Sequence, residues 1–199
     1  MYIAIEGIDT AGKSTQIQAL AQNFPNAIIT KEPGATSIGK EIREMVLSAR
    51  AKSKKAEFLL FLADRAEHIQ EVIEPNIESK MIISDRSAVS GIAYALVQGN
   101  ISKQELVALN NFATNNLYPQ KVFLLRLTKE ELEKRLSQKE LDGIELRGSA
   151  YLLQIQDAII EATRLLGLEL VAVDAGLKRE EITQIILKNI KTGIASFNS

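Results

Sequence analysis

The 199-residue chain has the length of one α/β domain, with 46% hydrophobic residues, 25% charged residues and a formal net charge of -1 at pH 7. This balance argues against the clustered basic face of a nucleic-acid-binding protein, so nucleic acid is not an expected partner. We predict a single domain over residues 1–199.

The chain contains no cysteine and a single histidine, His68. Disulfides and thiolate metal sites are therefore excluded, and a cytoplasmic location is expected. The N-terminal run reaches a carboxylate at Glu6 and then a glycine, which is not the pattern of a signal peptide or a membrane span, so no membrane partner is expected. His68 is expected to lie on a helix and to take part in an ordinary side-chain contact there.

Five short runs rich in Ile, Val and Leu alternate with longer stretches of helical period. They cover residues 2–5, 27–30, 81–84, 122–127 and 168–173. Such runs are typical of buried parallel strands. Ser102 to Glu105 and Thr128 to Glu131 match the capping-box pattern of helix starts. The order predicts an α/β fold with a five-stranded parallel sheet, helices on both faces, and ligands beyond the carboxyl ends of the strands.

The first predicted strand leads directly into Gly7-Ile8-Asp9-Thr10-Ala11-Gly12-Lys13-Ser14, a full match to the phosphate-loop pattern G-x-x-x-x-G-K-[ST]. In this pattern glycines let backbone N–H groups surround an anion at a helix N-terminus. Lys13 places a charge at the β and γ phosphates, and the Ser14 hydroxyl can ligate Mg²⁺. A plain glycine turn would explain the glycines but not Lys13 and Ser14 at their offsets. We therefore predict a P-loop NTPase-type fold that binds ATP and Mg²⁺ through Gly7, Ile8, Asp9, Thr10, Ala11, Gly12, Lys13, Ser14 and Thr15.

A phosphate loop alone does not separate a kinase from a GTPase switch or a motor ATPase. The sequence has neither an Asn-Lys-x-Asp string nor a hydrophobic strand that ends in Asp-x-x-Gly. Transfer of phosphate to a second small molecule needs a second group of cations, because the reaction depends on positioning and charge neutralisation. Three further segments provide such groups.

These segments are Lys31-Glu32-Pro33-Gly34-Ala35-Thr36 after the second strand, Phe61-Leu62-Ala63-Asp64-Arg65 in a helix, and Asp85-Arg86-Ser87 after the third strand. Together with Glu6-Gly7-Ile8-Asp9, the set closely resembles the thymidylate kinase family over essentially the whole chain. The family pattern reads Glu-Gly-x-Asp/Glu, Arg-Glu-Pro-Gly-Gly-Thr, Leu-Phe-x-Ala-x-Arg and Asp-Arg followed by an aromatic or His. Each segment alone is a weak signal, but four in the right order are specific.

The resemblance implies that Phe61 stacks on thymine and that Arg65, at i+4 on the same helix face, donates to a thymine carbonyl. Arg43 and Arg86 correspond to the arginines that hold the acceptor phosphate, for which a guanidinium fork is suited. Tyr94 corresponds to the aromatic packed against the deoxyribose. The remaining implied roles are Asp9 near the sugar hydroxyl and metal, Asp85 near Mg²⁺, and Ser90, Glu32 and Pro33 in the lining of the pocket. Lys13, Asp9 and Arg86 are the catalytic candidates outside the lid.

Single residues also admit structural interpretations. Phe61 alone is typical of a core residue, and Asp64 with Arg65 could form a solvated helix surface. Arg43 could make a surface i,i+3 pair, and Tyr94 could pack its helix. Only the joint pattern favours a binding site.

Several positions depart from the family pattern. Thr10 replaces a Gly or Arg of the cradle, Ala35 replaces the second glycine after Glu-Pro, and Ser87 replaces the aromatic after Asp-Arg. Gly91 and Ala95 stand where relatives often place an amide or hydroxyl for the base. Recognition of the base, including the choice of dTMP over dUMP, is therefore less well specified than the reaction type.

Glycines and mixed charges at about residues 135–148 predict a short mobile lid, in which Asp142-Gly143-Ile144-Glu145 aligns with a family pattern that often reads Asp-Arg-x-Glu. Closure would exclude water from the phosphoryl group. Because the cradle has no arginine, the lid would supply the catalytic cation from Arg135, Lys139 or Arg147. A polar linker is the alternative interpretation.

The segment Val173-Asp174-Ala175-Gly176 resembles the family segment beside adenine.

The resemblance therefore implies ATP-dependent phosphorylation of dTMP to dTDP, with ATP and dTMP as small-molecule partners and a homodimer as the assembly. A deoxynucleoside kinase is the nearest alternative, since Asp85-Arg86-Ser87 also resembles the Glu-Arg-Ser segment of that group, although Arg43 would then have no anion to bind. A nucleotide-dependent switch protein that transfers nothing is the second alternative.

Overall fold

The computed structural model describes residues 1–48, 51–138, 140 and 145–195. Its centre is a parallel sheet of five strands in the order β2-β3-β1-β4-β5. The strands are β1 (Tyr2–Glu6), β2 (Ile28–Lys31), β3 (Ile82–Asp85), β4 (Lys121–Arg126) and β5 (Glu169–Asp174). Each predicted apolar run lies within one residue of an observed strand at both ends, so the predicted α/β fold is confirmed.

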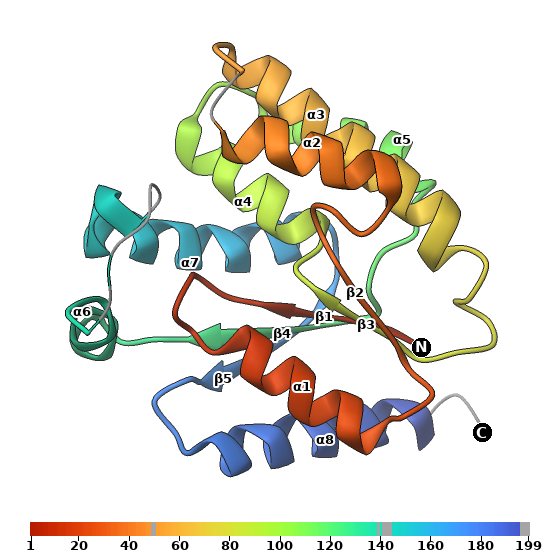
Figure 1. Ribbon diagram of the computed structural model, residues 1–199, viewed down its shortest axis with the longest axis vertical. Coiled ribbons are helices and arrows are strands. Elements are labelled where there is room, and N and C mark those ends of the chain that lie inside the picture. Colours follow the sequence, from red (N-terminus) through yellow and green to blue (C-terminus); the bar gives the residue numbers. More distant parts are fainter. Residues whose placement is uncertain (49–50, 139, 141–144, 196–199) are drawn as a thin grey trace.

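Helices cover both faces of the sheet (Figure 1). On one face lie α1 (Lys13–Asn23) and α8 (Arg179–Ala195), and on the other lie α4 (Ala88–Gln98), α5 (Lys103–Thr114) and α7 (Ser149–Leu165). Further out on that second side, α2 (Ser37–Leu47) packs against α3 (Lys54–His68), which continues into the π-helical turn η1 (Ile69–Ile73). The short helix α6 (Lys129–Leu136) and the 3-10 turn η2 (Glu145–Arg147) precede α7.

Hydrophobic burial explains why the sheet is central. All five residues of β1 are buried, and β4 is buried from Lys121 to Leu125. Such a strand loses apolar surface to helices on both faces, at about 25 cal/mol per Å² of area removed from water. None of the helices in the described ranges combines the length and the hydropathy that a membrane span needs.

The two predicted capping boxes differ in the structure. At α5 the box is complete, because the Ser102 side chain accepts from the Glu105 N–H and the Glu105 carboxylate accepts from the Ser102 N–H. At α6 only half of it forms: Thr128 Oγ1 accepts from the Glu131 N–H at 3.2 Å. The Glu131 carboxylate instead accepts from Arg135 Nε at 2.8 Å, since a charged donor is the stronger partner.

The order of the strands determines where a ligand can bind. The chain leaves β1 toward α1 on one face and leaves β3 toward α4 on the opposite face, although β1 and β3 are neighbours. The two loops therefore diverge at the carboxyl ends of these strands. Such a switch point opens a crevice, which is the usual ligand site of open α/β sheets.

Candidate active site

The loop from Gly7 to Gly12 has the backbone that a phosphate cradle needs. Gly7 has φ 152°, and a Cβ there would lie 3.0 Å from the Leu125 carbonyl oxygen and 3.1 Å from the Ala11 Cβ. Gly12 has φ 94° and is the N-cap of α1. Both positions therefore require glycine, and the loop turns directly into the positive end of the α1 dipole.

Lys13 lies in the first turn of α1 and is 8% exposed. Its Nζ donates to the Ile8 carbonyl oxygen at 3.2 Å and lies 3.7 Å from Asp9 Oδ1. Burial, together with the nearby positive charge of Arg86, lowers the pKa of Lys13 to about 8, although Asp9 and other carboxylates oppose this change. The ammonium group is thus held on oxygens of its own loop.

Ser14 and Asp85 are the predicted metal ligands. The Ser14 side chain is exposed on the first turn of α1, and Asp85 ends β3. Asp85 Oδ1 is buried and has no hydrogen-bond partner in the described part of the chain. A buried carboxylate oxygen of this kind fits a cation. No group of three or more His, Asp or Glu ligands occurs among the described residues.

Arg86 joins the loop after β3 to the phosphate loop. Its Nη2 donates to Asp9 Oδ1 at 2.6 Å, and its Nη1 donates to the Gly7 carbonyl oxygen and to Ser90 Oγ, each at 3.1 Å. Arg86 adopts a left-handed φ of 67°, a strained state for a residue with a side chain. Lys13 and Arg86 therefore meet at the Asp9 carboxylate.

Ser87 explains one departure from the family pattern. Its hydroxyl donates to Glu6 Oε1 at 2.8 Å and also caps α4 by accepting from the Val89 N–H. Ser90 donates to the other oxygen of Glu6. Burial raises the pKa of Glu6, and the two hydroxyls and Arg86 oppose that rise. The residue after Asp-Arg thus fastens the end of β1 to the start of α4.

Arg65 is 2% exposed and lies in a buried polar network, so the interpretation of Asp64 and Arg65 as a solvated helix surface is wrong. Its Nε donates to Glu32 Oε2 at 2.9 Å and its Nη1 donates to Asn110 Oδ1 at 2.7 Å. His68, which is also fully buried, binds the other oxygen of Glu32 at 3.0 Å. Burial favours a raised pKa for Glu32, but the charge of Arg65 and the bond to His68 hold that pKa below its usual value.

Arg43 and Asp64 both contact the turn that follows β2. Arg43 Nη1 donates to the Pro33 carbonyl oxygen at 3.0 Å, and a Cβ at Gly34 would lie 2.8 Å from Arg43 Cδ. Asp64 Oδ1 accepts from the Gly34 N–H at 2.8 Å. Arg43 therefore folds back on the turn.

Three aromatic side chains lie on α3, α4 and α7. Phe61 is half-buried on α3. Burial raises the pKa of Tyr94 on α4 to about 12, although Arg86 lowers it, and its hydroxyl is buried without a partner among the described residues. The hydroxyl of Tyr151 on α7 is likewise buried without a hydrogen-bond partner among the described residues, and its charge contributes to the raised pKa of Tyr94. Tyr151 was not among the residues predicted from sequence, and its i+4 spacing from Arg147 was the available signal.

The predicted lid cations have different environments. Arg135 uses its whole guanidinium: Nε donates to Glu131 at 2.8 Å, Nη1 to the Thr10 carbonyl at 2.9 Å and Nη2 to the Ala175 carbonyl at 2.7 Å. Arg147 is exposed, with its guanidinium carbon 3.7 Å from the centre of the Tyr151 ring. Lys139 and residues 141–144 lie outside the described residues.

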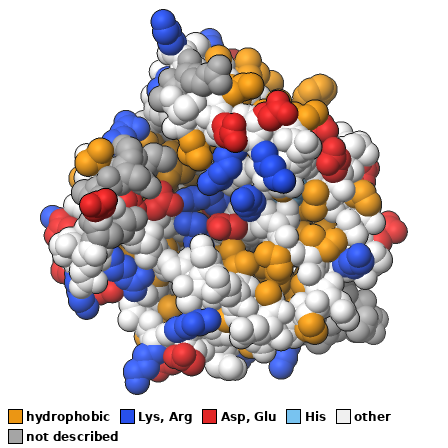
Figure 2. Space-filling view, in the orientation of Figure 1, with side chains coloured by type: hydrophobic (Ala, Val, Ile, Leu, Met, Phe, Trp, Pro, Cys, Tyr) orange, Lys and Arg blue, Asp and Glu red, His pale blue; other side chains and the backbone are white. Residues whose placement is uncertain are grey.

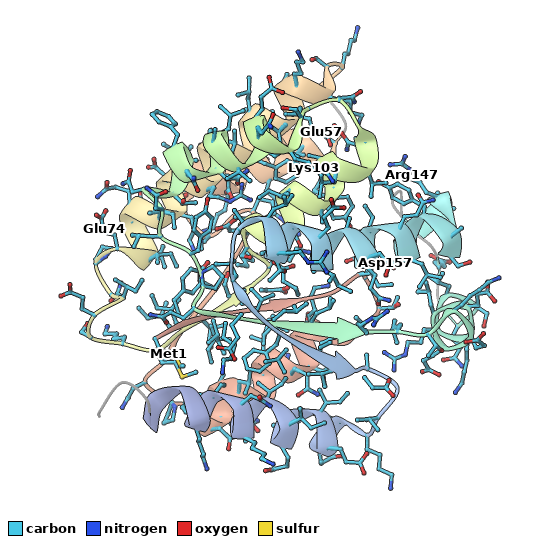
Figure 3. All side chains as sticks on the ribbon, turned by 180° about the vertical axis from the view of Figure 1, so that it is seen from behind. Met1, Glu57, Glu74, Lys103, Arg147 and Asp157 are labelled. Carbon is cyan, nitrogen blue, oxygen red and sulfur yellow. The ribbon has the colours of Figure 1, made fainter. Side chains whose placement is uncertain are left out.

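The site occupies one end of the sheet. Figure 3 labels Arg147 near the start of α7 and Met1 at the opposite side, where the strands begin. Figure 2 shows Lys and Arg side chains gathered with a few acidic ones near the middle of the visible face. The visible face thus carries a mixed but mainly basic cluster of charged side chains.

Comparison with known proteins gives consistent relatives. The sequence profile of the family described as "Thymidylate kinase" matches residues 5–186. The chain is 72% identical to "Thymidylate kinase" of Sulfurimonas denitrificans over 190 residues, which are 96% of this chain and 99% of that protein. It is 54% identical to "Thymidylate kinase" of Aliarcobacter butzleri over 94% of this chain and 96% of that one. A crystal structure of thymidylate kinase from Ehrlichia chaffeensis has the same fold, with a TM-score of 0.73 and 22% identity over 96% of this chain and 98% of that one.

Proposed function

This chain belongs to the thymidylate kinase family and phosphorylates dTMP to dTDP with ATP, and we propose that the residues around Asp9 divide this transfer between a donor side and an acceptor side. One observation carries the proposal. Lys13 of the phosphate loop and Arg86 of the segment after β3 both approach Asp9 Oδ1, at 3.7 Å and 2.6 Å. Cations from both sides thus converge on one point, from which they would position two phosphates and neutralise their charge.

On the donor side, the backbone of residues 7–15 would surround the β and γ phosphates of ATP, and Lys13 would leave its loop oxygens to contact them. Ser14 and the unpartnered oxygen of Asp85 are the proposed ligands of Mg²⁺, which supplies neutralisation of phosphate charge when it is bound. The segment that contains Ala175 would lie beside adenine, and Arg135 links that segment to Thr10 of the loop.

On the acceptor side, Arg86 and Arg43 would bind the phosphate of dTMP, with Asp9 near the sugar hydroxyl. Tyr94 would pack on the deoxyribose, and the half-buried Phe61 would stack on thymine. Arg65 would donate to a thymine carbonyl. Ser90, Glu32 and Pro33 contribute indirectly, since each of them bonds to an arginine of this group.

The chemistry needs no strong general base. A phosphate monoester carries close to two negative charges at neutral pH because its second pKa is about 6. An oxygen of the dTMP phosphate attacks the γ-phosphorus, the bond from that phosphorus to the bridging oxygen breaks, and ADP leaves. Positive charge from Lys13, Arg86 and a lid residue would stabilise the oxygens of the transferring group. With Arg135 engaged elsewhere, Arg147 and Lys139 are the stronger candidates for the lid cation.

A nucleotide panel tests this function directly. The enzyme is supplied with ATP, Mg²⁺ and one acceptor at a time from dTMP, dUMP, dCMP, AMP and thymidine, and ADP production is measured. We expect dTMP to give the highest kcat/KM and thymidine to give none. Turnover with thymidine but not dTMP would establish the deoxynucleoside kinase, and nucleotide binding without turnover for any acceptor would establish the switch protein.

We also propose a homodimer and a cytoplasmic location, the compartment in which ATP and deoxynucleotides are used. In the outer layer α3 packs against both α2 and α5, and each of these helices carries an exposed large apolar side chain. Leu47 is 64% exposed, Leu59 is 56% exposed and Phe112 is 86% exposed. Exposed apolar groups of this size on one helical layer support pairing with a second copy.

A further inference from the structure

The guanidinium of Arg65 is held by hydrogen bonds at two of its three nitrogens. Nε donates to Glu32 and Nη1 donates to Asn110, at 2.9 Å and 2.7 Å. Within the described residues, Nη2 donates to no protein atom. It faces Gly91 of α4 instead, where an added Cβ would lie 2.8 Å from it.

Asn110 is built to hold one orientation. It is completely buried on α5, which packs against α3 and α4. Its Nδ2 donates to the Leu106 carbonyl oxygen at 2.7 Å, so its Oδ1 must be the atom that faces Arg65. Arg65 offers only donors, and an amide oxygen with its other end fixed is a matched acceptor.

Glu32 is held in a similar way from the opposite side. His68 Nδ1 lies 3.0 Å from Glu32 Oε1, and His68 Nε2 shares a hydrogen bond of 2.7 Å with Thr30 Oγ1. Because an ionised carboxylate can only accept, His68 must carry its proton on Nδ1 and donate it to Glu32. Two fixed acceptors on two different nitrogens leave the guanidinium plane little freedom to rotate.

Gly91 supplies the space on the third side. Compared with relatives that carry an amide or hydroxyl here, Gly91 lacks a side chain that contacts the base. In this structure the missing side chain leaves room for Arg65. Arg65 Nη2 occupies the volume into which any side chain at position 91 would project. The glycine is therefore matched to this placement of the arginine.

We propose that Asn110 is a positioning residue and Gly91 a specificity-determining residue, which together aim Arg65 Nη2 at the acceptor base. This inference rests on the proposed function, in which Arg65 donates to a thymine carbonyl. Cytosine presents an amino group at the same place, and a donor held rigidly there disfavours it. If the guanidinium is released, it can turn away, and the difference between the two bases falls.

The test compares kcat/KM for dTMP and dCMP in wild type, Asn110→Leu, Asn110→Asp and Arg65→Ala. We expect Asn110→Leu to lower the dTMP-to-dCMP ratio about tenfold or more, through a raised KM for dTMP, with the KM for ATP unchanged. Asn110→Asp keeps an acceptor for Nη1 and should recover most of the ratio. In the Arg65→Ala background, Asn110→Leu should change the ratio no further, because the two residues act through one contact.

Gly91→Ala is a second variant, which tests the space that the glycine leaves for Arg65 Nη2. Alanine within a helix is favoured over glycine by about 1 kcal/mol, so α4 should not lose stability for local reasons. The new Cβ should nevertheless displace Nη2 and lower the dTMP-to-dCMP ratio. Thermal unfolding of each variant shows whether the chain is still folded.

Separate outcomes distinguish the two levels of the proposal. A wild type without dTMP turnover would remove the proposed function itself. If Arg65→Ala abolishes selectivity while Asn110→Leu and Gly91→Ala keep it, Arg65 reads the base without help and the inference is wrong. Equal losses for dTMP and dCMP in Asn110→Leu would reduce Asn110 to a support of the fold.

Discussion

Lys13 is the single side chain on which the transfer should depend most. Replacement by Ala removes a charge that acts mainly on the transferring phosphoryl group. Loss of one such preorganised contact raises the barrier by about 3 kcal/mol, so kcat should fall by a factor of the order of 10² or more. Steady-state kinetics measures this, and far-UV circular dichroism checks that the variant is folded. Turnover near that of wild type would contradict the assignment of the phosphate loop.

The lowered pKa of Lys13 has a consequence for ATP binding. With a pKa of about 8, roughly half of Lys13 is neutral at pH 8, whereas adjacent phosphates favour the ammonium form. ATP binding should therefore take up protons near pH 8 to 9 and almost none at pH 6.5. Calorimetry in two buffers with different ionisation enthalpies measures this uptake. Lys13→Met is the control, and the same uptake in that variant would assign the proton to another group.

Asp64 gives a pH dependence of stability. Its pKa is raised from 3.8 to about 6, by burial first and then by the charge of Glu32, while the Gly34 N–H opposes the rise. Between about pH 4 and 6 the folded chain therefore binds more protons at Asp64 than the unfolded chain, and its contribution to stability is lost as pH rises. Asn keeps an acceptor for Gly34 without the charge. Urea unfolding should show Asp64→Asn gaining stability relative to wild type from pH 4.5 to 7, by up to about 2 kcal/mol. A pH-independent difference would refute this account.

At the scale of elements, α6 connects the phosphate loop to the segment after β5 through Arg135. Arg135→Ala should raise the KM for ATP about tenfold and leave the KM for dTMP unchanged, because the Thr10 and Ala175 carbonyls lose a shared donor. Arg135→Lys keeps the charge but not the fork, so it should resemble the Ala variant.

Arg147→Ala should instead lower kcat by about tenfold or more with dTMP affinity nearly intact, since a closing cation acts on the transition state. If Arg147→Ala matches wild type, Lys139 is the remaining lid candidate.

The strands and the phosphate loop could be predicted from sequence because local rules determine them. An apolar run must be buried, and a cradle for an anion needs glycine, lysine and serine at fixed offsets. The Arg65 network could not be found in this way. Its bonds to Glu32 and Asn110 join positions 33 and 45 residues apart, and only tertiary packing brings them together. The same limit applies to Arg135, whose partners at Thr10 and Ala175 lie on other elements. The mobility of the lid stays a prediction.

At the scale of the whole molecule, the proposed dimer can be broken at one position. Phe112→Asp places a charge on the most exposed large apolar side chain among the described residues, at 86% exposure. We expect the variant to sediment as a monomer at concentrations where wild type sediments as a dimer, because a buried unpaired charge is costly. Leu177→Asp is the matched control, since Leu177 is exposed on the segment before α8, far along the chain from these helices. Dimers of equal stability in all three proteins would place the interface elsewhere.

The central position of β1 also affects how the chain matures during synthesis. β1 is made first, but its two neighbours in the sheet begin at Ile82 and Lys121. A ribosome adding roughly 5–20 residues per second needs roughly 6–24 s to pass from the end of β1 to β4. Until then β1, whose five residues are all buried in the folded sheet, lacks at least one of its two neighbours, and parallel pairing over such separations is slow. β1 is therefore synthesised before both of the strands that enclose it, and we expect the nascent chain to be most exposed to aggregation until β4 has been made.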